Sequence, residues 1–528
     1  MNPQMKPGLK RLLAGTLLAV AMASAWGADD SAVRFEISRF EVEGNTLLPQ
    51  AEVDAAVSRY AGKERGFGDI KEAQEALEKA YRDKGYKLVV IELPEQELNG
   101  GVVTLRVEET KVGRVTVRDN RYVDEANIRR SLPALKEGQP PDLDAVSANL
   151  KQGNESQARK VTMRLQGGED KDRVDVVLDV QDESPWKIMG SAANTGNAST
   201  GRTQLAVALQ NANLFGRDHL ATLQYITSAE EPGRVKVYGA SYHIPFYALG
   251  DSLDLYASYS NIDSGTINAG LFNLAVSGKG SAYGARYNQA LVRRSDFSST
   301  LSYGIDVKAF KNSVQFAGVE LGNDVTVHPV SIGYQANAPI RMGEVAGLVT
   351  LLHNIPGGPN GDRHAFMQAR MNAKADYSIL RMSGSITRAL ANDWQLRAIA
   401  NGQYTRDALV PGEQFGAGGA ASVRGFLERE FANDSGLAVN LEAYTPNLCP
   451  QAGWNCRLLG FYDTAHLSRN KALPGELDSL TIASVGVGVR FVLSGYANLQ
   501  LDYGHVINAG ITPRADSNRL HARLALAY

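Results

Sequence analysis

The stretch Leu253-Asp254-Leu255-Tyr256-Ala257 decides the fold, because its side chains alternate in the pattern of an extended strand. The segments Leu205-Ala206-Val207-Ala208-Leu209 and Leu499-Gln500-Leu501-Asp502-Tyr503 repeat this alternation far away in the chain. A period of two sends successive side chains to opposite faces of a strand. Helical spacing is absent from Lys187 onward, so this part of the chain is predicted to be β-structure.

The connections between the strand-like segments are short and long in turn. Short connections beside long polar or Gly-rich loops are typical of outer-membrane barrels. At about 20 residues for a strand and its connection, residues 187–528 hold about 16 strands, and an even number is the rule for such barrels. The sequence therefore predicts a transmembrane antiparallel β-barrel. The short connections are Pro245 to Asp251, Ala391 to Trp394 and Gly495-Tyr496, and the long ones are Ser228 to Gly233, Pro356 to His364, Val410 to Gly436 and Ala509 to Arg519.

The alternative is a large soluble β-sandwich or β-solenoid, which would need an apolar interior. The positions that would fill that interior are too polar here, among them Asp254, Ser260 and Asp502. The last strand, Leu520 to Tyr528, ends on an aromatic residue, the usual recognition feature of outer-membrane barrels. Tyr528 is accordingly predicted to be the C-terminal barrel signal.

The first 27 residues are predicted to be a signal peptide. Lys6, Lys10 and Arg11 precede an apolar stretch that ends in small residues, with cleavage expected after Gly27 or after Ala25. The alternative is a short membrane anchor. The formal net charge of −2 gives no basic excess that would suggest nucleic acid as a partner.

Residues 33–110 and 111–184 are predicted to be two copies of one small α/β domain with the order β-α-α-β-β. Phe40, Val42 and Asn45 of the first copy have counterparts about 75 residues later. The counterparts are Val115, Val117 and Asn120, and the segment Gln181 to Trp186 is the expected boundary with the barrel.

Cys449 and Cys456 are predicted to form a local disulfide, as suits an oxidising compartment. A metal site is the alternative, but further ligands are lacking nearby. The chain contains no Gly-x-Ser-x-Gly, no His-Glu-x-x-His and no P-loop motif. We therefore expect no enzymatic activity, no cofactor and no metal.

One constellation resembles a known family. The segment Glu413 to Phe426 ends in Val423-Arg424-Gly425-Phe426, which resembles the loop-six signature of the superfamily that joins POTRA domains to a barrel. Phe461-Tyr462-Asp463-Thr464-Ala465 resembles the second motif of that superfamily, Phe-x-Asp-x-Gly, with Ala465 in place of Gly. Two POTRA copies resemble the two-partner secretion transporters, the hemolysin and adhesin exporters of ShlB/FhaC/HecB type.

This resemblance implies that loop six, residues 410–436, folds into the lumen and that Arg424 meets Asp463 there. A buried guanidinium needs such a partner, and a carboxylate can accept two of its hydrogen bonds. Val-Arg-Gly-Phe as a chance tetrapeptide in an exposed loop is the alternative. The residues expected to hold the loop against the wall are Val423, Arg424, Gly425, Phe426, Phe461 and Asp463.

The family resemblance implies a monomeric pore in the outer membrane of a Gram-negative bacterium, with POTRA domains in the periplasm. The pore would recognise and secrete a large β-helical exoprotein without nucleotide hydrolysis, and the barrel-assembly machinery would insert it into outer-membrane lipid. Whether the cargo is a cytolysin, an adhesin or a contact-dependent toxin stays open. The alternatives are an outer-membrane protein assembly factor and a passive porin.

Exporters of this kind often carry a plug helix before the first POTRA domain. Only Ala28 to Val33 lie between the expected cleavage site and the first strand. A larger or more variable basal conductance is therefore expected.

Overall fold

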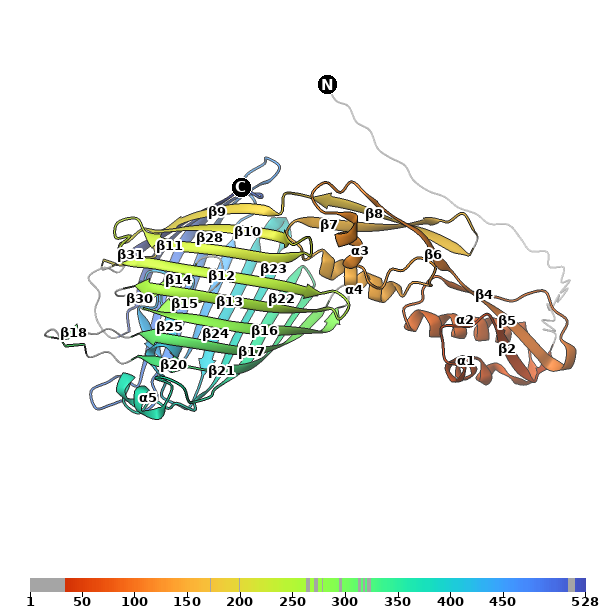
Figure 1. The fold of residues 1–528 in the computed structure, drawn as a ribbon, viewed down its shortest axis with the longest axis horizontal. Helices are drawn as coiled ribbons and strands as arrows, with labels where there is room; N and C mark the ends of the chain where they lie inside the picture. Colours follow the sequence, from red (N-terminus) through yellow and green to blue (C-terminus); the bar gives the residue numbers. More distant parts are fainter. Residues whose placement is uncertain are drawn as a thin grey trace, which may run out of the picture. The chain divides into compact units, whose positions relative to one another are not determined.

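Figure 1 shows the computed structural model of the chain. It describes residues 34–510 and 518–528, apart from 171, 199, 263–265, 270–273, 278, 294–296, 312–314, 317–318 and 321–323. The predicted signal peptide and the segment 28–33 that follows it lie outside the described residues. The described chain forms two units, one of residues 34–84 and 89–109 and one of residues 85–88 and 110–528.

The first unit is a small α/β domain whose helices cover a three-stranded sheet in the order β2-β5-β4. The stripe predicted on its longer helix is buried, with Ala73, Leu77 and Tyr81 fully enclosed. Its elements are β1 (Phe35–Ile37), β2 (Arg39–Glu43), α1 (Gln50–Val57), η1 (Ser58–Tyr60), β3 (Gly62–Arg65), α2 (Phe67–Asp83), β4 (Val89–Glu92), η2 (Asn99–Gly101) and β5 (Val102–Glu109).

The single opening strand predicted for this domain is divided at Ser38. The segment before Ser38 pairs with β3, and the segment after it pairs in parallel with β5. The Ser38 backbone N–H donates to the carbonyl of Gly101 (2.7 Å), and its hydroxyl donates to that of Gly100 (2.8 Å). These two bonds hold the chain where it changes partner.

The second copy has the predicted order, with a sheet β6-β8-β7. Asn45 and Asn120 occupy equivalent turns, since each side-chain amide donates to the carbonyl three residues ahead. The Asp182 carboxylate accepts backbone N–H groups of Arg121, Tyr122 and Val123 at the end of that turn. Burial raises the pKa of Asp182, but these hydrogen bonds outweigh it and leave the pKa below its usual value. The elements are β6 (Lys111–Arg118), α3 (Glu125–Arg130), α4 (Leu143–Gly153), β7 (Arg159–Gly167) and β8 (Arg173–Asp182).

The rest of the chain forms a closed antiparallel barrel (Figure 1). β20 and β21 both pair with β17 and act as one interrupted strand, so the wall has 16 strands in the described residues. This confirms the predicted barrel. Its strands are β9 (Trp186–Ala193), β10 (Gln204–Leu214), β11 (His219–Ser228), β12 (Val235–Phe246), β13 (Asp251–Ile262), β16 (Lys279–Arg293), β17 (Ser298–Lys311), β20 (Val325–Val327), β21 (Pro329–Ile340), β22 (Gly343–Asn354), β23 (Ser378–Ala389), β24 (Gln395–Tyr404), β27 (Ser435–Tyr444), β28 (Trp454–Ser468), β29 (Ser479–Leu493), β30 (Ala497–Asn508) and β31 (Asn518–Ala527).

Smaller elements occupy the connections between the barrel strands. They are β14 (Thr266–Ala269), β15 (Leu274–Ser277), β18 (Gln315–Phe316), β19 (Val319–Glu320), α5 (Arg363–Ala369), η3 (Ala391–Asp393), η4 (Pro411–Glu413), β25 (Phe415–Ala417) and β26 (Phe431–Asn433). None of the helices in the described ranges is long and apolar enough to cross a membrane.

The barrel closes where the last strand meets the first. β31 pairs with β9, and the backbones of Ile188 and Tyr528 exchange two hydrogen bonds (2.8 and 2.9 Å). The Tyr528 side chain is 94% exposed, at the outer edge of this seam. An aromatic side chain at this position suits a membrane–water interface.

The second α/β copy docks on the short-turn end of the barrel, within the same unit. The Arg159 guanidinium pairs with Asp218 in the β10–β11 turn (2.7 Å), and both side chains are buried. The Tyr247 hydroxyl, in the turn between β12 and β13, donates to the same carboxylate (2.7 Å). The Asn127 amide donates to the Gly216 carbonyl (2.8 Å). Buried contacts therefore hold this domain against the barrel, in addition to the covalent connection between them.

Candidate functional site

The long connection between β24 and β27 folds back into the lumen of the barrel. It contains η4 and the hairpin of β25 and β26. Its tip, Val423 to Phe426, is buried against the inner wall, and both apolar side chains of the tip are fully enclosed. They pack in a cluster with wall residues of β27 to β30, including Ala438, Ile482 and Val506. The segment 410–436 is therefore positioned as an internal plug.

Arg424 lies at the centre of this plug, and its side chain is only 3% exposed. Its Nε and Nη2 donate to the two carboxylate oxygens of Asp463, each at 2.7 Å. The Arg424 backbone N–H donates to the same carboxylate (3.1 Å), and the Asn440 amide donates to its other oxygen (2.8 Å). Asp463 thus accepts four hydrogen bonds. The bidentate arrangement is the one that a guanidinium and a carboxylate favour.

Two further carboxylates, which the sequence motifs do not identify, face the remaining side of Arg424. Nη1 lies 2.9 Å from Glu442 and 3.5 Å from Asp502. Asp502 is also paired with Arg490 (2.9 Å), so it is already largely neutralised. Their inward position follows from the two-residue alternation of β27 and β30, but their proximity to Arg424 depends on strand register.

The aromatic residue of the second motif, Phe461, lies directly beside the guanidinium. The Arg424 Cζ is 3.5 Å from the centre of its ring, within the range of a cation–π contact. Alternation on β28 sends Phe461, Asp463 and Ala465 inward and Tyr462 outward. Ala465, the position where the motif departs from Gly, is fully buried in the cluster around the tip. The Ala465 methyl group is therefore accommodated in the packing around the tip of loop six.

Gly425 allows the tip to approach the backbone of the wall. Its φ of +94° belongs to the left-handed region that favours glycine. A Cβ at Gly504 on β30 would lie 2.7 Å from the backbone nitrogen of Gly425, so glycine is required on the wall as well. The Gly425 N–H donates to Nε2 of His521 on β31 (2.9 Å). The sequence motifs do not reveal His521 either.

A second set of ion pairs holds the base of the plug. The fully buried Glu413 pairs with Lys308 on β17 (2.8 Å) and with Arg381 on β23 (2.9 Å). At the other end of the segment, Asp434 pairs with Arg370, the residue after α5, and accepts the backbone N–H of Asn470 (2.7 Å). Loop six is therefore anchored at its tip and at both ends.

Cys449 lies in the β27–β28 connection, and Cys456 lies near the start of β28. They form a disulfide with a Cα–Cα distance of 5.4 Å. The described residues contain no group of three His, Cys, Asp or Glu side chains arranged to hold a metal ion.

Two family models match the chain. The sequence model of the family described as haemolysin secretion/activation protein ShlB/FhaC/HecB matches residues 172–491, more than half of the chain. The chain belongs to this family. A second model, described as the POTRA domain of ShlB type, matches residues 35–110 of this family member.

Curated relatives cover most of the chain. The outer membrane transporter CdiB of Dickeya dadantii is 24% identical over 522 residues, which are 94% of this chain and 87% of the relative. The heme/hemopexin transporter protein HuxB of Haemophilus influenzae is 20% identical over 538 residues, with 98% and 89% covered.

Solved structures show the same fold. The structure of CdiB from Escherichia coli superimposes with a TM-score of 0.77 at 20% identity, covering 95% of this chain and 92% of that one. BamA from Haemophilus ducreyi, lacking POTRA domains 1–3, gives a TM-score of 0.53 at 15% identity, covering 94% and 100%. The ShlB/FhaC/HecB family member is thus an outer-membrane transporter of two-partner secretion, with periplasmic POTRA domains, and not an enzyme.

Proposed function

We propose that this transporter recognises one large β-helical exoprotein of the hemolysin or adhesin type and releases it through the barrel. The observation that carries the proposal is the buried Arg424, clamped by Asp463 in a plug that lies inside the barrel. A pore for small solutes has no need of a plug anchored at three places. A pore for an unfolded chain must be closed between passages, and a reversible ionic clamp suits that need.

Cargo capture is assigned to the POTRA domains by strand addition. The described sheet of the first domain ends on β2 and β4, and Val90 on β4 is 48% exposed. An unfolded polypeptide can add a strand to such an edge, with main-chain hydrogen bonds giving affinity and side chains giving specificity. Folding of the cargo outside the cell would then prevent its return. We further propose that the transporter acts as a monomer and is inserted by the barrel-assembly machinery.

Deletion of residues 35–109 tests the capture step. The transporter is expressed with a large β-helical exoprotein encoded beside it in the genome, and the exoprotein is measured in the medium and in the periplasm. We expect a folded barrel, seen as heat-modifiable migration on gels, with the exoprotein retained in the periplasm. Undiminished secretion would refute the proposal, and loss of other outer-membrane proteins would favour an assembly factor instead.

A further inference from the structure

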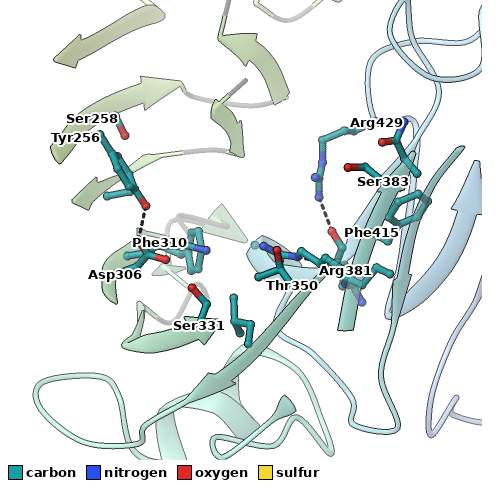
Figure 2. Close-up of a pocket in the computed structure, with 18 of the residues that line it drawn as sticks. Tyr256, Ser258, Asp306, Phe310, Ser331, Thr350, Arg381, Ser383, Phe415 and Arg429 are labelled. Atoms are coloured by element: carbon teal, nitrogen blue, oxygen red, sulfur yellow. Dashed lines mark hydrogen bonds between the residues drawn. The ribbon is translucent and has the colours of Figure 1, made fainter. Parts of the chain in front are cut away.

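Loop six does not fill the lumen evenly. A cavity of about 670 Å³ remains between the loop and the inner faces of the wall strands from β13 to β24. Figure 2 shows this cavity with Tyr256 and Asp306 on one side, and with Arg429 of loop six and Arg381 of the wall on the other. A second cavity of about 220 Å³ lies between the loop and the wall around β9, β10, β30 and β31. We call these the large and the small cavity.

The charged groups around the large cavity are mainly cationic. Arg286, Lys308, Arg381 and Arg429 all line it, whereas Asp306 is the one carboxylate among its described lining residues. Glu413 lies behind Lys308 and Arg381. Four cationic side chains therefore face two carboxylates, which leaves an excess of two positive charges.

The two carboxylates have no remaining capacity to neutralise this excess. Asp306 accepts both Arg286 nitrogens at 2.7 Å and the Tyr256 hydroxyl at 2.6 Å. Glu413 is shared by Lys308 and Arg381.

Arg429 stands apart from these pairs. It donates to the main-chain carbonyl of Gln414 (3.1 Å) and, within the described chain, has no carboxylate at ion-pair distance. Because loop six supplies Arg429, the loop brings its own positive charge to the cavity.

The small cavity has no such cationic excess, because Asp502 in its lining is already paired with Arg490. Its charged lining residues are Glu428, Asp502 and Arg523, two carboxylates against one guanidinium, with His521 counted as neutral. Loop six thus separates a positive compartment from one without an excess of positive charge. Charged walls of low dielectric concentrate ions of opposite sign in a narrow aqueous space.

We propose that the large cavity is a binding site for small inorganic anions, such as chloride or phosphate, and that it makes the resting pore anion-selective. The guanidinium groups of Arg381 and Arg429 present planar, fixed donors of the kind that bind oxyanions. The site would act while loop six is in the lumen and no exoprotein is present, so it does not depend on the proposed cargo.

Reversal potentials in planar bilayers under a KCl gradient test this selectivity. We expect chloride to permeate more readily than potassium through the purified full-length transporter. Arg429→Gln should lower the chloride-to-potassium permeability ratio about tenfold, because removing one unit charge ~6 Å from the ion path in water disfavours chloride and favours potassium by about threefold each. Arg523→Gln in the small cavity is the matched control and should lower the ratio much less, because Arg523 does not line the large cavity. A cation-selective native pore, or equal ratios for native and Arg429→Gln, would overturn the proposal.

A second measurement does not depend on current. In detergent, inorganic phosphate should raise the melting temperature of the native transporter, and Arg429→Gln should weaken the apparent phosphate affinity about threefold by the same electrostatic argument. Sodium chloride at equal ionic strength corrects for screening of surface charges. A phosphate response that is the same in native protein and in Arg429→Gln would show that no anion site involves this cavity.

Discussion

Replacing Asp463 by Ala is the sharpest perturbation of the plug. Asp463 accepts four hydrogen bonds, three of them from Arg424. Removing one partner of a buried ion pair costs about 3–5 kcal/mol. Glu442 stays 2.9 Å from Arg424 and compensates part of the loss, so the lower end of this range applies. A loss of about 3 kcal/mol shifts the ratio of plugged to unplugged molecules roughly 10²-fold.

Single-channel recording in planar bilayers measures that ratio as the fraction of time spent in the open state. Asp306→Ala is the matched control, because Asp306 is equally buried and pairs with Arg286 on the wall without touching loop six. We expect Asp463→Ala to open roughly a hundred times more often than the control. Open fractions within about twofold of each other would refute the reasoning, since a tenfold change needs only about 1.4 kcal/mol.

The charge-swapped variant R424D/D463R extends this prediction. It should not restore closure, because the new carboxylate at position 424 would face Glu442 and Asp502. Like charges at such distances repel one another. Recovery of native closure in this double variant would mean that the two extra carboxylates do not matter.

Three further predictions concern other parts of the molecule. The pKa of Asp182 is lowered in the folded POTRA domain, so this carboxylate contributes fully to stability above the ordinary carboxyl pKa, and the contribution is lost as pH falls through the lowered value. Asp182→Asn should therefore reduce the loss of melting temperature at acidic pH. Asp218→Asn leaves the buried Arg159 without its counter-charge and should cost about 3–5 kcal/mol, seen as faster hydrogen exchange in the turn between β10 and β11; unchanged exchange there would contradict the rigid docking. Gly425→Ala strains a left-handed residue and brings a methyl group 3.1 Å from Val506, so closure should weaken by about 1–2 kcal/mol, with roughly tenfold more opening in bilayers; a native open fraction would speak against the close approach.

The barrel, the duplicated domain and the Arg424–Asp463 pair could be predicted because each depends on a local pattern or a motif. The two-residue alternation of β28 is visible in the sequence, and so is the inward position of Asp463. The contact of Arg424 with Glu442 and Asp502 could not be predicted. It depends on which residues lie opposite one another across β27 to β30, and long-range strand pairing sets that register.

The ion pairs at the base of the plug could not be predicted from the sequence either. Glu413 begins the quoted motif, yet nothing local to it indicates Lys308 or Arg381, which lie far away in the chain and meet it only when the barrel closes. The division of the first predicted strand at Ser38 likewise depends on a turn more than 60 residues later.

The plug of this pore, loop six, belongs to the same polypeptide as the wall and continues directly into β24 and β27. It therefore cannot diffuse away when it is pushed aside, and its return needs only the motion of a loop, which is faster than the synthesis or recruitment of another protein. If loop six is displaced during secretion, as we propose, one molecule can then reseal itself after every exoprotein. Under this proposal, the permeability barrier of the cell surface is interrupted only for as long as each passage lasts.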